Sequence, residues 1–178
     1  MGDAAAAVAE DLDLDMARGG DEALRVQCAV AEGAARFYAS IFPNSSVDRV
    51  VTMPADSPSG PAGSVVVVEF TLMGTPMTAM AAGPLDPFNH AVSLSVTCDT
   101  QDEIDRFYGA LLDGGVEEQC GWVRDRYGLC WQIVPAMMSE FYASEDREAG
   151  RRAAEAMMTM KKLDIAALRA AFEGNPAP

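Results

Sequence analysis

The segments "RFYASIFPNS" (residues 36–45) and "RFYGALLDGG" (residues 106–115) begin with the same three letters and lie 70 positions apart. Apolar residues recur at 34, 37, 38, 41 and 42 around the first segment, and at 104, 107, 108, 111 and 112 around the second. Apolar residues at this spacing share one face of an α-helix. Each segment therefore predicts an amphipathic helix, and the shared register indicates an internal repeat.

The borders of the two helices support this interpretation. "TQDE" at 100–103 is a capping box, in which the Thr100 hydroxyl and the Glu103 carboxylate pair with free backbone N–H groups. The first helix is expected to end at residues 43–45 and the second at residues 113–115, where turn-forming residues follow.

Strand-like runs surround both helices in the same order. Residues 23–29 precede the first helix and residues 91–97 the second, and Cys28 and Cys98 are again 70 positions apart. The runs that follow the helices are 47–52, 64–72 and 76–82 in the first half, and 116–120, 121–124 and 129–135 in the second. The last two runs of each half are joined by a glycine-containing turn, "LMGTP" or "DRYGL". Each half thus predicts a strand, a helix and three further strands.

The sequence predicts an α+β fold of two βαβββ modules, at residues 23–85 and 90–135. One module alone leaves a sheet face uncovered, so we expect two curved sheets to enclose a cup, with the helices outside. The cup is the candidate site. Residues 1–22 are expected to be an acidic, disordered extension, and residues 136–178 a C-terminal helical extension.

The tail predicts two helices. One face of the first carries alanine and methionine: Ala149, Ala153, Ala156, Met157 and Met160. Lys161 and Lys162 suit the negative end of that helix, and Asp164 can cap the second. We expect the methionine stripe to pack on the sheet or on a partner subunit, because methionine fills irregular apolar gaps. A ligand-lining role is the alternative.

Charge excludes some classes of function. The net charge of −14 would repel nucleic acid and anionic membrane surfaces. No apolar run approaches the roughly 18 to 20 residues that span a bilayer, and the first residues lack the basic region of a secretory signal. A cytoplasmic location is expected, and the four cysteines are expected to be reduced thiols.

A resemblance to a known family rests on "FYASIFPNS", "PAGSVVVVEFTLMGTPMTAM", "GPLDPFNHAVSLSVTCDTQDEIDRFY", "LLDGGVEEQCGWVRDRYGLCWQIVP" and "MKKLDIAALRAAF". With these segments the chain resembles the PhnB-like branch of the vicinal-oxygen-chelate superfamily, historically named 3-demethylubiquinone-9 3-methyltransferase. The superfamily also contains glyoxalases, ring-cleaving dioxygenases and bleomycin-resistance proteins. The resemblance covers about residues 24–173 and implies a homodimer.

The enzymes of this superfamily hold a divalent cation through His and Glu side chains, and the resemblance locates the corresponding positions at Ala91, near Ala81 and at Gln132. Two methyl groups and a neutral amide do not supply the three or four ligands that a cation needs. The single histidine of the chain, His90, is next to the expected position. We therefore expect no metal and no cofactor in the cup. A thiolate site involving Cys28 and Cys98 is the alternative to a structural role for these thiols in the core.

Strand alternation predicts which side chains face the cup. Val92, Leu94 and Val96 should lie under the helix, which leaves Ser93 and Ser95 toward the cup. The repeat adds Arg25 and Gln27, and Gln132 follows with Cys130 and Val134. An arginine beside hydroxyl and amide groups suits a carboxylate or phosphate. Alternatively, Arg25 extends into solvent and the Ser and Gln groups satisfy one another through water.

The segment "DPFNH" at 86–90 joins the modules near a mouth of the predicted cup. Phe88, Asn89 and His90 are candidates to contact a ligand, against the alternative of an ordinary turn with an exposed histidine. Trp122 and Trp131 are expected in the core, although a tryptophan face also stacks on planar ligands.

Three hypotheses about function follow. The first is a small-molecule-binding protein for an anionic or planar ligand. The second is an enzyme: a methyltransferase as in the family's historical name, or a lyase or isomerase without metal. No glycine-rich turn from strand to helix marks a nucleotide cofactor site, and no nucleophile and base lie at a telling spacing. The third is a purely structural dimer.

Overall fold

The computed structural model describes residues 30–56, 61–81 and 88–175. The chain divides into two compact units, Met1–Asp86 and Pro87–Pro178, and each is described by itself. The predicted strand at 23–29, with Arg25, Gln27 and Cys28, lies outside the described residues, as does the extension at 1–22. The predicted module boundaries and the cup between the modules stay predictions.

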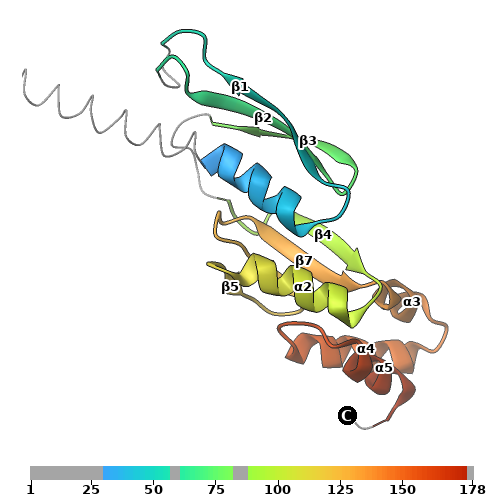
Figure 1. Cartoon of the computed structure of the whole chain (residues 1–178). Helices are drawn as coiled ribbons and strands as arrows, with labels where there is room; N and C mark the ends of the chain where they lie inside the picture. Colours follow the sequence, from blue (N-terminus) through green and yellow to red (C-terminus); the bar gives the residue numbers. More distant parts are fainter. Residues whose placement is uncertain (1–29, 57–60, 82–87, 176–178) are drawn as a thin grey trace, which may run out of the picture. The chain divides into compact units, whose positions relative to one another are not determined.

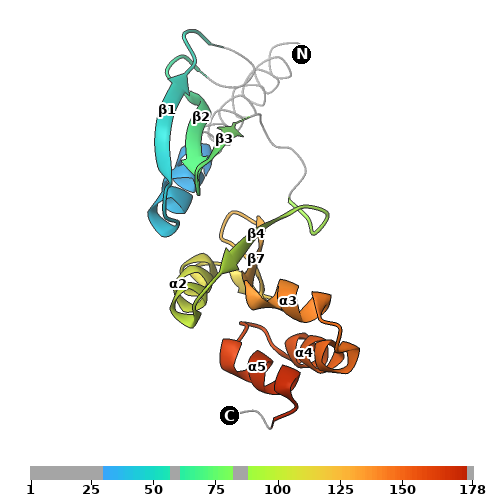
Figure 2. The same cartoon turned by 90° about the vertical axis from the view of Figure 1, so that its right-hand side faces the viewer.

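The first unit contains a helix over residues 30–41 and a sheet of three antiparallel strands in the order β1-β2-β3. The strands are β1 (Ser46–Thr52), β2 (Val65–Leu72) and β3 (Thr75–Met80). Tyr38 and Ile41 of the helix and Phe42 directly after it are buried, which makes three of the five apolar positions of the predicted stripe. The helix lies along one face of the sheet (Figures 1 and 2). Val68, Phe70 and Leu72 of β2 are buried at alternate positions, because side chains alternate between the two faces of a strand.

The turn between β2 and β3 has positive φ angles at both central residues, 50° at Met73 and 80° at Gly74. These angles belong to the tight hairpin turn whose twist matches that of the strands. The hairpin predicted at "LMGTP" is therefore confirmed, with β3 beginning at Thr75 and not at Pro76.

The second unit contains a complete strand-helix-three-strand module. Its elements are β4 (Ser93–Cys98), α2 (Gln101–Leu112), β5 (Val116–Glu117), β6 (Trp122–Arg124) and β7 (Cys130–Pro135). The sheet order is β4-β7-β6-β5, and β4 and β7 run parallel while the other pairs are antiparallel. In both units the helix is thus followed by three strands, and each of these strands is antiparallel to the next. The predicted α+β class is confirmed.

Helix α2 begins and packs as its sequence predicts. The Glu103 N–H donates to the Thr100 hydroxyl, and the Glu103 carboxylate accepts from the Thr100 backbone N–H, which completes the capping box. Ile104, Phe107, Tyr108 and Leu111 are buried. They cover the sheet face that carries Val96, Val123, Trp131 and Ile133, all at most 2% exposed.

Some strands are shorter than their apolar runs. The run 116–120 forms only β5, because Cys120 and Gly121 turn the chain with φ angles of 61° and 82°. The backbone N–H groups of these two residues donate to the carbonyls of Met160 and Lys161 at 2.8 and 2.7 Å. A Cβ at Gly121 would lie 2.7 Å from the Ile133 carbonyl oxygen, so this turn requires glycine. The predicted placement of Val92 under α2 is wrong: Val92 precedes β4 and is 66% exposed.

Three helices follow the second sheet: α3 (Met137–Ala143), α4 (Arg147–Thr159) and α5 (Ile165–Glu173). The last two were predicted, and Asp164 caps α5 by accepting from the Ala167 N–H at 2.8 Å. The predicted stripe of α4 does pack in the interior, but mainly against the neighbouring helices, rather than on the sheet or a partner subunit as expected. Ala149 and Ala153 are buried, and Ala156, Met157 and Met160 pack on a cluster of Met138, Leu163 and Leu168. Lys161 and Lys162 pair with the carboxylates of Glu117 and Asp105, rather than serving the end of α4. Among the described residues, no helix is long and apolar enough to cross a membrane.

Candidate functional site

The candidate site lies on the face of the second sheet that points away from α2, which we call the distal face. Alternation along the strands places a polar row there. The side chains of the whole distal face are Ser93, Ser95 and Thr97 from β4, Cys130, Gln132 and Val134 from β7, and Trp122 and Arg124 from β6. Val134 packs against the α3–α5 cluster, so the helical extension covers the end of β7 that is remote from Cys130.

Two of the predicted ligand-binding residues meet directly in the middle of this face. The Gln132 side-chain amide donates to the Ser93 hydroxyl at 2.7 Å, and both side chains are partly buried. Ser95 is exposed and lies beside Gln132 in the parallel register of β4 and β7. The direct bond replaces the water-mediated one considered from sequence. It also fixes the side chain of Gln132 relative to β4.

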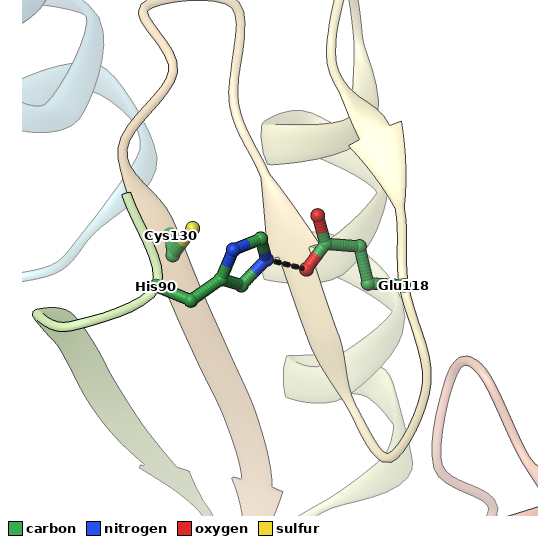
Figure 3. Close-up of side chains that lie close together, drawn as sticks. All are labelled: His90, Glu118 and Cys130. Atoms are coloured by element: carbon green, nitrogen blue, oxygen red, sulfur yellow. Dashed lines mark hydrogen bonds and ion pairs between the residues drawn. The ribbon is translucent and has the colours of Figure 1, made fainter. Parts of the chain in front are cut away.

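A second group gathers at the edge of the distal face where β7 begins. His90 Nε2 lies 2.7 Å from Glu118 Oε2, and Figure 3 shows the imidazole between the Glu118 carboxylate and the Cys130 thiol. One ligand atom from each of the three residues lies within 4.8 Å of the other two. Arg124 Nε lies 3.6 Å from Glu118 Oε1. The His90 ring lies 6.0 Å from the Trp122 ring, so the group has a planar aromatic wall.

The local folding of the chain explains how these side chains come together. Glu118 directly follows β5, and its backbone N–H donates to the Trp122 carbonyl at 3.0 Å, which closes the β5–β6 hairpin. Cys130 is the first residue of β7 and pairs with Ser93 on one side and Arg124 on the other. His90 is held in the segment before β4, where the Asn89 side chain accepts from the Ala91 N–H at 2.9 Å.

The two buried thiols of the second unit differ in position. Cys130 is fully buried on the distal face, and its pKa is raised first by burial and then by Glu118, with Arg124 acting in the opposite direction. Cys98 is 1% exposed on the α2 side, and burial, helped by Glu103 and Asp99, raises its pKa to about 12. Cys98 is therefore a core residue, as the simpler interpretation held, and it faces away from Cys130.

The predicted residues divide into three groups. His90, Ser93, Ser95 and Gln132 lie on or at the edge of one sheet face, and Arg25 and Gln27 lie outside the described residues. Phe88 is 63% exposed, and Asn89 serves its own turn. Trp131 is fully buried as predicted, whereas Trp122 is partly buried on the distal face.

Sequence reasoning did not select Glu118 and Arg124 and gave Cys130 no role. Strand alternation assigned Cys130 to the right face, but the short hairpin after β5 determines which of Glu117 and Glu118 turns toward it. Glu117 instead pairs with Lys161 at 2.9 Å. The positions that the superfamily resemblance gave for metal ligands, Ala81, Ala91 and Gln132, do not fit a cation, because none offers a charged or imidazole ligand.

The strand order of the second unit and the polar face opposite its helix define the class: an α+β protein with a glyoxalase/bleomycin-resistance-like fold. The family model described as 3-demethylubiquinone-9 3-methyltransferase matches residues 26–134, more than half of the sequence, and the chain belongs to that family. No curated protein matches the chain.

One of three similar solved structures supports this assignment. A PhnB protein from Bacillus cereus is 31% identical, with 60% of this chain and 91% of that chain covered and a TM-score of 0.54. A protein from Pseudomonas aeruginosa is 21% identical, with coverages of 58% and 86% and a TM-score of 0.44. A protein from Staphylococcus aureus is 25% identical, with coverages of 58% and 84% and a TM-score of 0.24. The Bacillus cereus protein supports the fold, whereas the other two superpose too loosely to support it.

Proposed function

We propose that the chain binds a small anionic or planar molecule on the distal face of its second sheet, as a binding member of the vicinal-oxygen-chelate superfamily. The observation that supports this most is the polar row of Ser93, Ser95 and Gln132 across neighbouring strands. A polar row on a sheet face is also compatible with plain solvation. The side chains at the adjoining edge of the face argue for more than solvation. They combine the buried thiol of Cys130, the partly buried ring of Trp122 and the cationic side chain of Arg124.

The chemistry of the face suits the proposed ligand. Arg124 offers planar N–H donors that match a carboxylate or phosphate. Ser95 and Ser93 offer hydroxyl groups, and Trp122 offers an aromatic surface for a planar ring. Arg25 and Gln27 remain proposed contacts on the basis of the repeat, and Phe88, Asn89 and His90 remain proposed contacts from the segment before β4.

The family's methyltransferase name is the second candidate function. In the second unit the turn from β4 to α2 consists of Asp99 and Thr100 and contains no glycine. The Glu103 carboxylate accepts from the N–H groups of both residues, and the Glu103 N–H donates to Thr100. This helix N-terminus is therefore closed by its own side chains and carries negative charge, which disfavours a phosphate-bearing or similar anionic cofactor there.

Calorimetry with benzoate and phenylphosphonate tests the proposal, because both probes are planar anions. We expect saturable binding that Arg124→Gln weakens by about tenfold or more, the scale of one lost charge-assisted contact. Arg169→Gln removes the same charge from an exposed position on α5 and should leave affinity unchanged. Arg25→Ala should also weaken binding. Heat without saturation, or equal losses in Arg124→Gln and Arg169→Gln, would count against the site, and saturable binding of S-adenosylmethionine would favour the methyltransferase.

The homodimer implied by the family resemblance is also part of the proposal. Light scattering on the purified chain should give twice the mass of one chain. A monomer at all concentrations tested would remove the dimer and leave the ligand site open to test.

A further inference from the structure

We propose that His90, Glu118 and Cys130 form a binding site for a thiophilic divalent cation, with Zn²⁺ as the expected ion. The three side chains come from three separate places in the second unit: the segment before β4, the residue after β5 and the first residue of β7. This inference goes beyond the proposed function, because the cation would bind whether or not a small molecule is present.

The ligand types select the kind of cation. One imidazole nitrogen, one thiolate and one carboxylate oxygen form a mixed soft and borderline set, which favours zinc and its chemical relatives over the oxygen-bound Mg²⁺ and Ca²⁺. Three protein ligands leave a fourth tetrahedral position for water or another ligand, as in open zinc sites.

The distances between the three ligand atoms need a small adjustment before they can hold a zinc ion. Zinc bonds of about 2.0–2.3 Å in tetrahedral geometry put ligand atoms about 3.3–3.8 Å apart. The three ligand atoms are within 4.8 Å of one another, and the hydrogen bond between His90 and Glu118 is 2.7 Å long. That pair must open by roughly half an ångström and the thiol must approach. The His90 side chain is 60% exposed and belongs to a segment outside the strands, so this movement disturbs no core packing.

Charge favours the cation. Binding would displace the thiol proton of Cys130 to solvent, so that one thiolate and one carboxylate balance the two charges of the metal. The chain carries a net charge of −14, which attracts cations in general. Arg124 is the nearby opposing charge, at 3.6 Å from Glu118, and its side chain is 44% exposed and free to turn toward solvent.

The proposed site differs from the positions that the superfamily resemblance indicates, and it departs from the metal-free expectation of the sequence. Those positions, Ala91 and Gln132, lie one and two residues from His90 and Cys130. The sequence pattern therefore indicated residues next to His90 and Cys130. It did not indicate the set of His90, Glu118 and Cys130, because these come together only in the folded hairpin.

The test is a Co²⁺ titration of the full chain after reduction and removal of metals with a chelator. We expect one Co²⁺ per chain, visible bands of a tetrahedral ion and a near-ultraviolet thiolate-to-cobalt band, all lost on adding an equivalent of Zn²⁺. Cys130→Ser should remove the thiolate band. Cys120→Ser changes the partly exposed thiol of the adjacent turn and should leave the spectrum unchanged.

His90→Asn keeps the test decisive if Cys130→Ser fails to fold, because His90 is largely exposed. It should weaken Co²⁺ binding by more than the roughly 10- to 100-fold that loss of an outer partner costs, without changing the circular dichroism of the chain. The proposal is overturned by the absence of a thiolate band, by a band that persists in Cys130→Ser, or by unchanged affinity in His90→Asn. None of these results affects the benzoate assay, so the two proposals fail separately.

Discussion

Asp125 is the one charged side chain found buried among the described residues, with 4% exposure. Its carboxylate accepts from the backbone N–H groups of Tyr127 and Leu129 and from the indole N–H of Trp131, at 2.8, 3.1 and 2.8 Å. Asp125 therefore shapes the β6–β7 turn. It also provides the hydrogen-bond acceptor for the buried indole N–H of Trp131, the largest side chain of the core. The sequence "DRYGL" predicted the turn but gave no sign of the bond to Trp131.

Replacing Asp125 by Ala should be costly, because three donors lose their acceptor in a buried site. We expect the free energy of unfolding to fall by about 2–4 kcal/mol, measured by urea unfolding followed by circular dichroism. Asp99→Ala, at an exposed position of the same unit, should change it by less than about 0.5 kcal/mol. Equal effects of the two substitutions would show that the Asp125 bonds contribute little.

Cys98 makes stability depend on pH at the alkaline end. Its pKa rises from the ordinary 9.0 to about 12 in the folded chain, mainly through burial. A group whose folded pKa is raised stabilises the fold fully below its unfolded pKa, and this contribution is lost as pH rises toward the folded value. Between about pH 9 and about pH 12, the unfolding free energy should therefore fall more steeply in the natural chain than in Cys98→Ala. Parallel curves in urea unfolding would contradict this.

At the scale of elements, predictions succeeded where local signals were strong. The capping box and the apolar stripe fixed α2, and Asp164 fixed the start of α5. Helix α3 was missed because the residue that precedes it, Ala136, offers no side-chain cap. β5 and β6 came out shorter than predicted because the turn at Cys120 and Gly121 depends on hydrogen bonds to residues 160 and 161, and periodicity carries no information about contacts so distant in sequence.

Two helical glycines provide a matched test of element packing. A Cβ at Gly109 of α2 would meet nothing within 4 Å, whereas at Gly150 of α4 it would lie 2.9 Å from the Phe141 carbonyl oxygen. Gly109→Ala should therefore raise the unfolding free energy by about 0.5–1 kcal/mol, the difference in helix propensity. Gly150→Ala should lower it, because α3 and α4 must move apart. Thermal unfolding of both variants would check this, and the account would be wrong if Gly150→Ala were also stabilising.

At the scale of the whole molecule, the repeat predicted two similar units, and the family match and the Bacillus cereus structure support the fold. The sequence located Ser93, Ser95 and Gln132 on one face because strand alternation is a local rule. It could not assemble His90, Glu118 and Cys130, because their proximity depends on a hairpin, a loop and a strand end meeting in three dimensions.

The central claim is that the distal face of the second sheet binds a small anionic molecule, and amide chemical-shift mapping during a benzoate titration tests it most directly. The account predicts saturable shifts that are largest at Ser93, Ser95 and Gln132, with Arg124 and Glu118 next, and small at residues of α4 and α5. Saturable shifts centred on α4 and α5, or none that saturate anywhere, would contradict it.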